Sequence, residues 1–276
     1  TPNRTRFLDD VNRPQYHLIE PEKWMNEPHA PFFFNGYYHI FYQANLHAPI
    51  WDSIQWGHLA SKDMVHWQDL PLALQSEKGF YDELGCWSGS GLVDKDGVPR
   101  IYYTAGNSNR FPNQAVALAQ PEDTEEDPLL KKWKKYPSLI KEQDIGWLGE
   151  FRDPFVWIEN DSYFMLVGTG DEHNGGGNAA LYASSDGLHW GSCGMLVDYD
   201  YESNQRCGHV WELPVLLPLR DDSGKIVCHI MIFCACQIEH DIVETYYFLG
   251  NWDASKRTFT KWNDRAQLLD LGHGTF

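Results

Sequence analysis

"ASKDMVHW" at residues 60–67 recurs as "ASSDGLHW" at residues 183–190, and this repeat is the strongest indication of the fold class. Looser copies end at Trp133 and Trp262, so four tryptophans divide the chain into units of about 60 residues. A unit of that length holds four short strands, which is what one blade of a β-propeller requires. In each copy, a turn with an aspartate precedes a tryptophan that can fill the gap between two blades.

The rest of the sequence also predicts strands. Short β-branched and aromatic runs alternate with Gly, Asn, Asp and Pro, which is typical of strands joined by tight turns. The clearest runs are "GYYHIFYQ" (36–43), "PRIYYTAG" (99–106), "DSYFMLVG" (161–168) and "IVCHIMIFCAC" (226–236). Helical periodicity is almost absent, and we expect only one short helix, near residues 122–135. We therefore predict an all-β propeller of four-stranded antiparallel blades around a central axial pocket.

Composition excludes several classes of function. The 276 residues carry a formal net charge of −17, which disfavours nucleic acid and anionic membranes as partners. No apolar run is long enough to form a membrane helix, so we expect a soluble protein, either cytoplasmic or secreted with its signal removed. The six cysteines form no CxxC pair, and we expect structural thiols rather than a disulfide or a metal site. No metal and no cofactor is predicted.

Three carboxylates stand out because each is followed by proline, at once or after one residue, and has apolar neighbours. They are Glu27 in "WMNEPHAP" (24–31), Asp153 in "EFRDPFVW" (150–157) and Glu212 in "HVWELPVLL" (209–217). A propeller gathers its innermost strands around one axis, so we expect one shared pocket rather than three separate surface acids. Two carboxylates on either side of a glycosidic bond suit glycoside hydrolysis. The neighbouring Arg152 would hold Asp153 ionised, which suits hydroxyl binding better than proton transfer.

With these motifs the sequence resembles glycoside hydrolase family 32, the family of invertases, levanases and inulinases. The resemblance extends from about Arg13 to the last residue. It rests on "WMNEPH" (24–29), "FRDP" (151–154), "WELP" (211–214), "FYQ" (41–43), "WGHLASKDMVHW" (56–67) and "WSGSG" (87–91). The resemblance implies a five-bladed propeller followed by a β-sandwich. We expect residues 1–276 to be one catalytic propeller domain with an incomplete final blade. The missing C-terminal part of the same polypeptide, including the β-sandwich, would pack against it.

The resemblance also implies roles for individual residues. Glu27 matches the nucleophile, Glu212 the general acid/base, and Asp153 with Arg152 the pair that stabilises the transition state. The positions that match fructosyl-binding residues are Asn26, Gln43, Trp51, Trp87 and Ser88. Leu213 replaces a cysteine of the family motif. The implied reaction is hydrolysis with retention, or fructosyl transfer, at β-fructofuranosidic bonds of sucrose or of fructans such as inulin and levan. The expected partner is a fructose-containing saccharide.

Glu27 departs from the family, whose nucleophile is Asp. The extra methylene moves the carboxylate by about 1.5 Å, the length of a C–C bond. Three explanations stay open: a backbone recessed to accommodate Glu27 as a working nucleophile, an attenuated protein that still binds fructan, or Glu27 acting as a base on water. A non-catalytic fructan-binding propeller is the rival function, with Trp51 and Trp87 as stacking platforms. Both tryptophans could instead fill the core.

Overall fold

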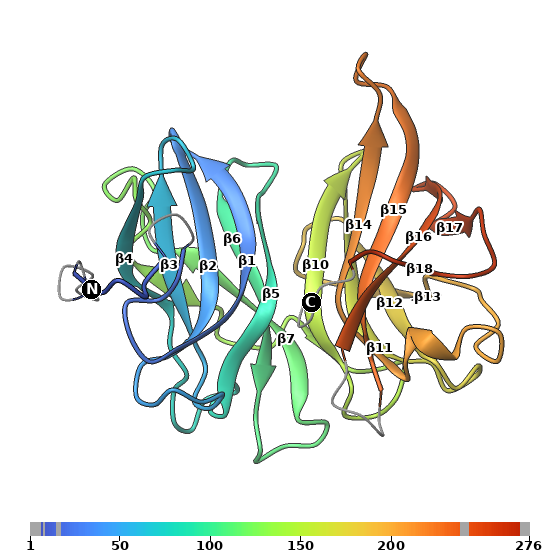
Figure 1. Cartoon of the computed structure of the whole chain (residues 1–276), viewed down its shortest axis with the longest axis horizontal. Helices are drawn as coiled ribbons and strands as arrows, with labels where there is room; N and C mark the ends of the chain where they lie inside the picture. Colours follow the sequence, from blue (N-terminus) through green and yellow to red (C-terminus); the bar gives the residue numbers. More distant parts are fainter. Residues whose placement is uncertain (1–6, 8, 15–17, 238–242, 271–276) are drawn as a thin grey trace.

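The computed structural model describes residue 7 and residues 9–14, 18–237 and 243–270. These residues form an all-β propeller of four antiparallel blades, which follow one another along the chain (Figure 1). Within each blade, the first four strands pair in the order in which they occur in the sequence. No helix in this part of the chain is long and apolar enough to cross a membrane.

The first two blades contain the N-terminal half of the strands. Blade 1 consists of β1 (Trp24–Phe34), β2 (Tyr37–Asn45), β3 (Gln55–Ser61) and β4 (Trp67–Leu74). Blade 2 consists of β5 (Gly85–Val93), β6 (Pro99–Gly106), β7 (Gln114–Pro121), β8 (Trp133–Lys135) and the short β9 (Lys141–Glu142), which also pairs with β7.

The other two blades repeat this arrangement. Blade 3 consists of β10 (Arg152–Glu159), β11 (Ser162–Gly170), β12 (Gly177–Ser184) and β13 (Gly191–Met195). Blade 4 consists of β14 (Val210–Arg220), β15 (Ile226–Cys236), β16 (Val243–Asp253), β17 (Thr258–Lys261) and β18 (Gln267–Leu268), which pairs with β16. A 3-10 helix over Gln205–Cys207 precedes β14.

The hydrophobic core lies between neighbouring blades. Because side chains alternate along a strand, Tyr102 and Tyr103 of β6 face opposite sides of blade 2. Tyr103 belongs to the cluster shared with blade 1, and Tyr102 to the cluster shared with blade 3. A third cluster, around Trp211, joins blades 3 and 4. Each middle blade is therefore buried on both faces, which explains why its strands are apolar without a polar alternation.

The repeated tryptophans lie at or next to the fourth strand of each blade. Trp133 packs edge-on against Phe41 of blade 1, with ring centroids 5.7 Å apart, and Trp190 packs edge-on against Tyr102 of blade 2 at 6.0 Å. These two tryptophans fill gaps between blades as predicted. Trp262 is 52% exposed and does not.

The exact repeat is a turn with the same hydrogen bonds in blades 1 and 3. Asp63 Oδ1 accepts bonds from the backbone N–H groups of Val65 and His66, and its other oxygen bonds the His66 ring. Asp186 makes the same contacts with the two residues that follow Gly187. The repeat therefore stabilises the entry into the fourth strand.

Two expectations are corrected by the structure. The described residues form four blades, not five: the tryptophan spacing indicated four units, and the fifth blade was implied by the family resemblance and by the expectation of an incomplete final blade. The short helix expected near residues 122–135 is also wrong. Asp123 and Asp127 instead accept bonds from backbone N–H groups in turns, and the segment ends in β8. Local side-chain bonds of this kind compete with helix formation.

Candidate active site

Four innermost strands lie around the propeller axis: β1 contacts β5, β5 contacts β10, and β10 contacts β14. In Figure 1, β5 and β10 face each other along the middle of the molecule. Each of these strands is irregular where it carries a predicted site residue. The register shifts at Met25/Pro28, Trp87/Gly89, Arg152/Phe155 and Glu212/Val215. A β-bulge redirects a side chain out of the regular alternation, so these four bulges aim their residues into the hub.

The bulges explain why each acid stands close to a proline. Pro154 and Pro214 lie inside the bulges, where the ladder is broken and no N–H is needed. Asp153 and Leu213 adopt left-handed backbone angles, with φ of 60° and 48°. Such residues cost about 1–2 kcal/mol each and tend to cluster at functional sites.

Glu27 is held by two neutral partners. Gln43 Nε2 donates to Glu27 Oε1 at 3.1 Å, and the Ser88 hydroxyl donates to the same oxygen. The other oxygen, Oε2, is buried and has no partner among the described residues. His29 Nδ1 lies 3.8 Å from Oε1. The longer side chain of Glu27 therefore reaches the partners that the pocket offers, and one oxygen stays available.

Arg152 lies between two carboxylates. Its Nε donates to Glu212 Oε1 at 2.9 Å, and its Nη1 donates to Glu150 and, at 3.4 Å, to Gln114 Oε1. The guanidinium thus orients Glu212 directly. Neither Glu150 nor Gln114 was identified from the sequence.

Asp153 behaves differently from the sequence expectation. Its carboxyl is buried, and burial together with the charge of Glu212 raises the pKa of Asp153 to about 7. Arg152 and the Leu213 N–H oppose this shift, but Arg152 hydrogen-bonds the two glutamates instead. The prediction that Arg152 holds Asp153 ionised is therefore wrong, because desolvation exceeds the attraction of the neighbouring cation.

A chain of hydrogen bonds links all four blades across the hub. The Ser88 side chain contacts Glu27 and Gln43 of blade 1, and the Ser88 carbonyl accepts from Thr104 Oγ1 at 2.9 Å. Thr104 Oγ1 accepts from the Asp153 N–H at 2.8 Å. Asp153 Oδ2 then accepts from the Leu213 N–H of blade 4 at 3.0 Å.

These groups surround a single cavity of about 310 Å³. Its lining consists of Asn26, Glu27, Gln43, Trp51, Trp87, Ser88, Gln114, Glu150, Arg152, Asp153, Glu212 and Leu213. We call it the acid pocket. All nine site residues named from the sequence lie in this lining, and their roles stay predictions. Glu150 lacks the proline that marked the other three acids, and its position three residues before Asp153 is the only sequence signal that could have indicated it.

Two thiols lie beside Glu212, although Leu213 replaces the cysteine of the family motif. Cys234 is opposite Glu212 in the ladder between β14 and β15. Burial raises the pKa of the Cys234 thiol to about 12. Burial and a hydrogen bond to Glu212 raise the pKa of Cys236. All six cysteines are free, and the neighbouring strand thus supplies a sulfur next to the acid.

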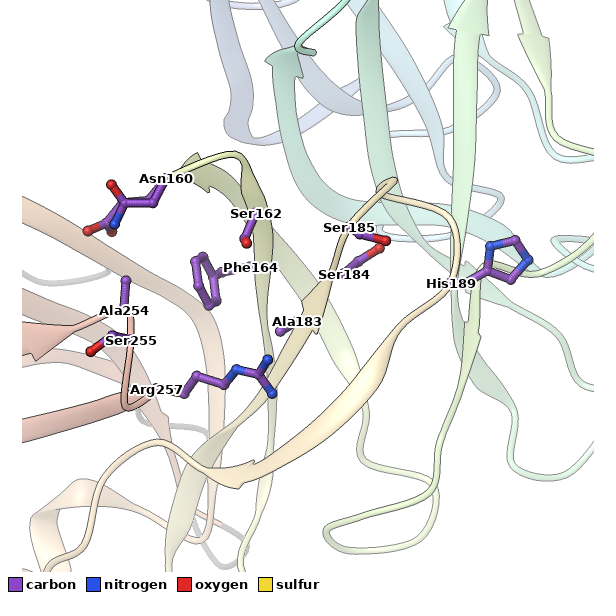
Figure 2. A pocket seen from close by; sticks show the side chains of 11 residues that line it. Asn160, Ser162, Phe164, Ala183, Ser184, Ser185, His189, Ala254, Ser255 and Arg257 are labelled. Atoms are coloured by element: carbon purple, nitrogen blue, oxygen red, sulfur yellow. The ribbon is translucent and has the colours of Figure 1, made fainter.

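A second, larger cavity of about 550 Å³ lies between blades 3 and 4 (Figure 2). We call it the outer cavity; it is lined by Glu159, Asn160, Ser162, Phe164, Ala183, Ser184, Ser185, His189, Ala254, Ser255 and Arg257. Figure 2 shows small hydroxyl and methyl side chains around the Phe164 ring, with Arg257 extending toward Ser184. It contains one carboxylate and none of the predicted site residues.

The chemistry of the acid pocket is that of carboxylates and amides. Within the described ranges, no group of three or more His, Cys, Asp or Glu side chains is placed to hold a metal ion. The pocket brings together a carboxylate with a free oxygen, a carboxyl hydrogen-bonded by arginine, and a buried carboxyl whose pKa lies near 7. Such a set can attack, donate a proton and stabilise positive charge.

Comparisons with known proteins agree on one family. The sequence profile of the glycosyl hydrolases family 32 N-terminal domain matches residues 17–276. A sucrose-6-phosphate hydrolase of Zymomonas mobilis is 34% identical over 274 residues, covering 97% of this chain and 52% of the relative. A fructan 1-exohydrolase of Hordeum vulgare is 34% identical over 273 residues, covering 95% of this chain and 44% of the relative. This chain therefore spans about half the length of the curated relatives it matches.

Solved structures give the same result. Fructan 1-exohydrolase IIa from Cichorium intybus superposes with a TM-score of 0.77 at 28% identity, covering 90% of this chain and 46% of that one. A Bombyx mori β-fructofuranosidase superposes with a TM-score of 0.79 at 26% identity, covering 98% of this chain and 56% of that one.

Proposed function

We propose that this chain, which belongs to glycosyl hydrolase family 32, carries the catalytic acids of an enzyme that cleaves β-fructofuranosidic bonds. The observation that carries the proposal is the convergence of Glu27, Asp153 and Glu212, from three blades, on one cavity. Residues remote along the chain meet there, with one carboxylate oxygen that has no partner among the described residues and another carboxyl hydrogen-bonded by Arg152.

The proposed reaction retains the configuration at the anomeric carbon. Glu27 attacks that carbon of the fructosyl unit while Glu212 protonates the departing oxygen. Water, or the hydroxyl of a second sugar, then takes the fructosyl group, and Glu212 accepts its proton. Asp153 binds hydroxyls of the fructosyl ring, and Arg152 holds Glu212 in position.

The substrates we propose are sucrose and fructans such as inulin and levan. Relatives named for sucrose-6-phosphate and for fructan support this substrate class, and a Cichorium intybus structure contains 1-kestose. Gln43, Ser88 and Asn26 offer amide and hydroxyl groups to sugar hydroxyls, and Trp51 and Trp87 offer ring faces. We further propose that residues 1–276 act as one catalytic domain and that the rest of the polypeptide packs against it.

The test is product analysis combined with one substitution. The protein is incubated with sucrose, 1-kestose, inulin and levan, and released fructose is measured. Glu212→Gln keeps the size of the side chain and removes its proton, so turnover should fall about a thousandfold. Glu125→Gln, at an exposed acid outside the acid pocket, is the matched control and should leave the rate unchanged.

The outcomes separate the two candidate functions. Fructose release that depends on Glu212 supports the enzyme. Saturable binding of fructan without release would instead favour the fructan-binding propeller. A Glu212→Gln variant with the parental rate would overturn the assignment of the acid.

A further inference from the structure

The acid pocket is too small to hold a long saccharide. Its volume of about 310 Å³ lies at the lower end of ligand sites, which span roughly 300–1,000 Å³. A substrate of three or more sugar units must therefore leave the pocket and cross its rim. The side chains of that rim decide which longer substrates bind well.

Blades 1 and 2 carry an exposed aromatic ring in equivalent loops. The loop between the second and third strands of blade 1 (46–54) carries Trp51, which is 51% exposed and lines the acid pocket. The equivalent loop of blade 2 (107–113) carries Phe111, which is 74% exposed. The equivalent loop of blade 3 (171–176, "DEHNGG") contains no apolar ring.

Phe111 lies close to the pocket, beside the backbone of Gly149. A Cβ atom on Gly149 would lie 3.9 Å from the Phe111 ring and 3.9 Å from Asn113 Oδ1, so both side chains lie against Gly149. The next residue, Glu150, lines the pocket, as does Gln114 after Asn113. Leu148, on the other side of Gly149, is 60% exposed. We call Phe111, Asn113 and Leu148 the rim patch.

The two loops that carry the rim patch are fixed in place. Asn107 Nδ2 donates to the Phe80 carbonyl at 2.9 Å, and Arg110 Nη2 donates to the Ala105 carbonyl at 2.8 Å. In the other loop, the Gly149 N–H donates to Gln143 Oε1 at 2.9 Å. A rigid ring beside an amide is suited to a sugar, because the apolar face of the sugar packs on the ring while its hydroxyls bond the amide.

We infer that the rim patch is a binding site for the saccharide units beyond the disaccharide, with Phe111 as its stacking platform. The inference rests on the proposed function, since it concerns the substrate class of the same pocket. Phe111 thereby determines specificity for chain length. A ligand that ends at the second unit does not reach it.

The test compares chain lengths in one variant. Values of kcat/KM are measured for sucrose and for fructo-oligosaccharides of three, four and five units. In Phe111→Ala, the ratio of kcat/KM for the pentamer to kcat/KM for sucrose should fall about tenfold. The value of kcat/KM for sucrose itself should change less than twofold. Phe111→Tyr keeps an aromatic ring at this position, so its ratio should equal that of the parental protein. Phe33→Ala is the matched control, because Phe33 is also an exposed ring (55%) but lies in strand β1 and outside the lining of the acid pocket.

Two results would overturn the inference. One is an unchanged ratio in Phe111→Ala, and the other is an equal loss on sucrose and on the pentamer. If the parental protein releases no fructose, the proposed function fails. A binding measurement then tests the inference about the rim patch. Calorimetric titration with the pentamer should then show about tenfold weaker binding to Phe111→Ala than to the parental protein, and equal affinities would overturn the inference.

Discussion

The acid pocket and the outer cavity differ in a way that volume does not reveal. The outer cavity is the larger, at about 550 Å³ against about 310 Å³. Glu159 accepts from the Trp252 indole N–H at 2.9 Å, the Ser184 hydroxyl bonds Asp186, and no described lining residue of this cavity has a buried polar atom without a partner. In the acid pocket, Glu27 Oε2, Gln43 Oε1 and Trp87 Nε1 are buried with no partner among the described residues.

Between these two cavities, buried polar atoms without a partner distinguish the predicted site better than cavity volume does. Burying such an atom without a hydrogen bond costs roughly 1–3 kcal/mol in proteins. A protein keeps several of them together where a ligand supplies the missing bonds. Substitutions in the two cavities should therefore have very different effects.

The largest effect is expected at Glu27. Glu27→Gln removes the nucleophilic charge and should lower kcat/KM for sucrose about a thousandfold. Glu27→Asp keeps the charge but withdraws the carboxylate by about 1.5 Å from Gln43 and Ser88, and a misplacement of this size costs about a hundredfold. Steady-state kinetics measure both. A gain in rate for Glu27→Asp would mean that Glu27 attenuates an active site built for Asp.

The second prediction concerns Asp153 and the dependence of stability on pH. Because burial raises the pKa of Asp153 from 3.8 to about 7, the folded state binds a proton there that the unfolded state has released. Between about pH 4 and pH 7, this group therefore lowers the free energy of unfolding as pH rises. Asp153→Asn removes this titration. The free energy of unfolding of the variant should therefore rise relative to that of the parental protein by a few kcal/mol between about pH 4 and pH 7. Above pH 7, the difference between the two proteins should stay constant.

Urea unfolding at pH 4, 5, 6, 7 and 8 measures that difference. A constant difference between Asp153→Asn and the parental protein at every pH would show that the carboxyl keeps its ordinary pKa. The control is Glu125→Gln, whose exposed carboxyl should contribute no such slope.

Glu150 should have a moderate effect. Glu150→Gln keeps a hydrogen-bond acceptor for Arg152 but removes one of the two charges that hold the guanidinium. Because Glu150 is partly exposed, the expected loss in kcat/KM is only about fivefold, with the fold and the unfolding midpoint unchanged. A pH profile of kcat separates this role from a catalytic one: a full loss of turnover at all pH values would make Glu150 a reacting group.

The smallest effect is expected in the outer cavity. Arg257 extends into it and has no carboxylate partner within ion-pair distance in the part of the chain that the structure describes (Figure 2). Arg257→Gln should leave kcat/KM for sucrose and inulin within twofold of the parental values. A tenfold loss would mean that the outer cavity takes part in substrate binding and would remove the contrast between the two cavities.

Much of this arrangement could be predicted from the sequence. The tryptophan spacing indicated four units, and four blades are present. The repeat is visible in the sequence because its turn depends on hydrogen bonds between neighbouring residues, such as those of Asp63. The acids Glu27, Asp153 and Glu212 could be found because each stands close to a proline that accompanies a break in an innermost strand.

Other features depend on contacts that no short pattern records. Cys236 lies beside Glu212 only through the register of β14 and β15, and Glu150 meets Arg152 only through the conformation of the preceding loop. The ionisation of Asp153 was misjudged because a neighbouring cation is visible in the sequence, whereas the depth of burial is not.

The hydrogen-bonded chain from Gln43 through Ser88, Thr104 and Asp153 to Leu213 also bears on how the protein matures. Its members come from four separately folded sheets, and contacts between such distant segments form slowly. No single sheet contains the lining of the acid pocket. Under the proposed function, we therefore expect fructose release to return during refolding only after the last sheet has docked.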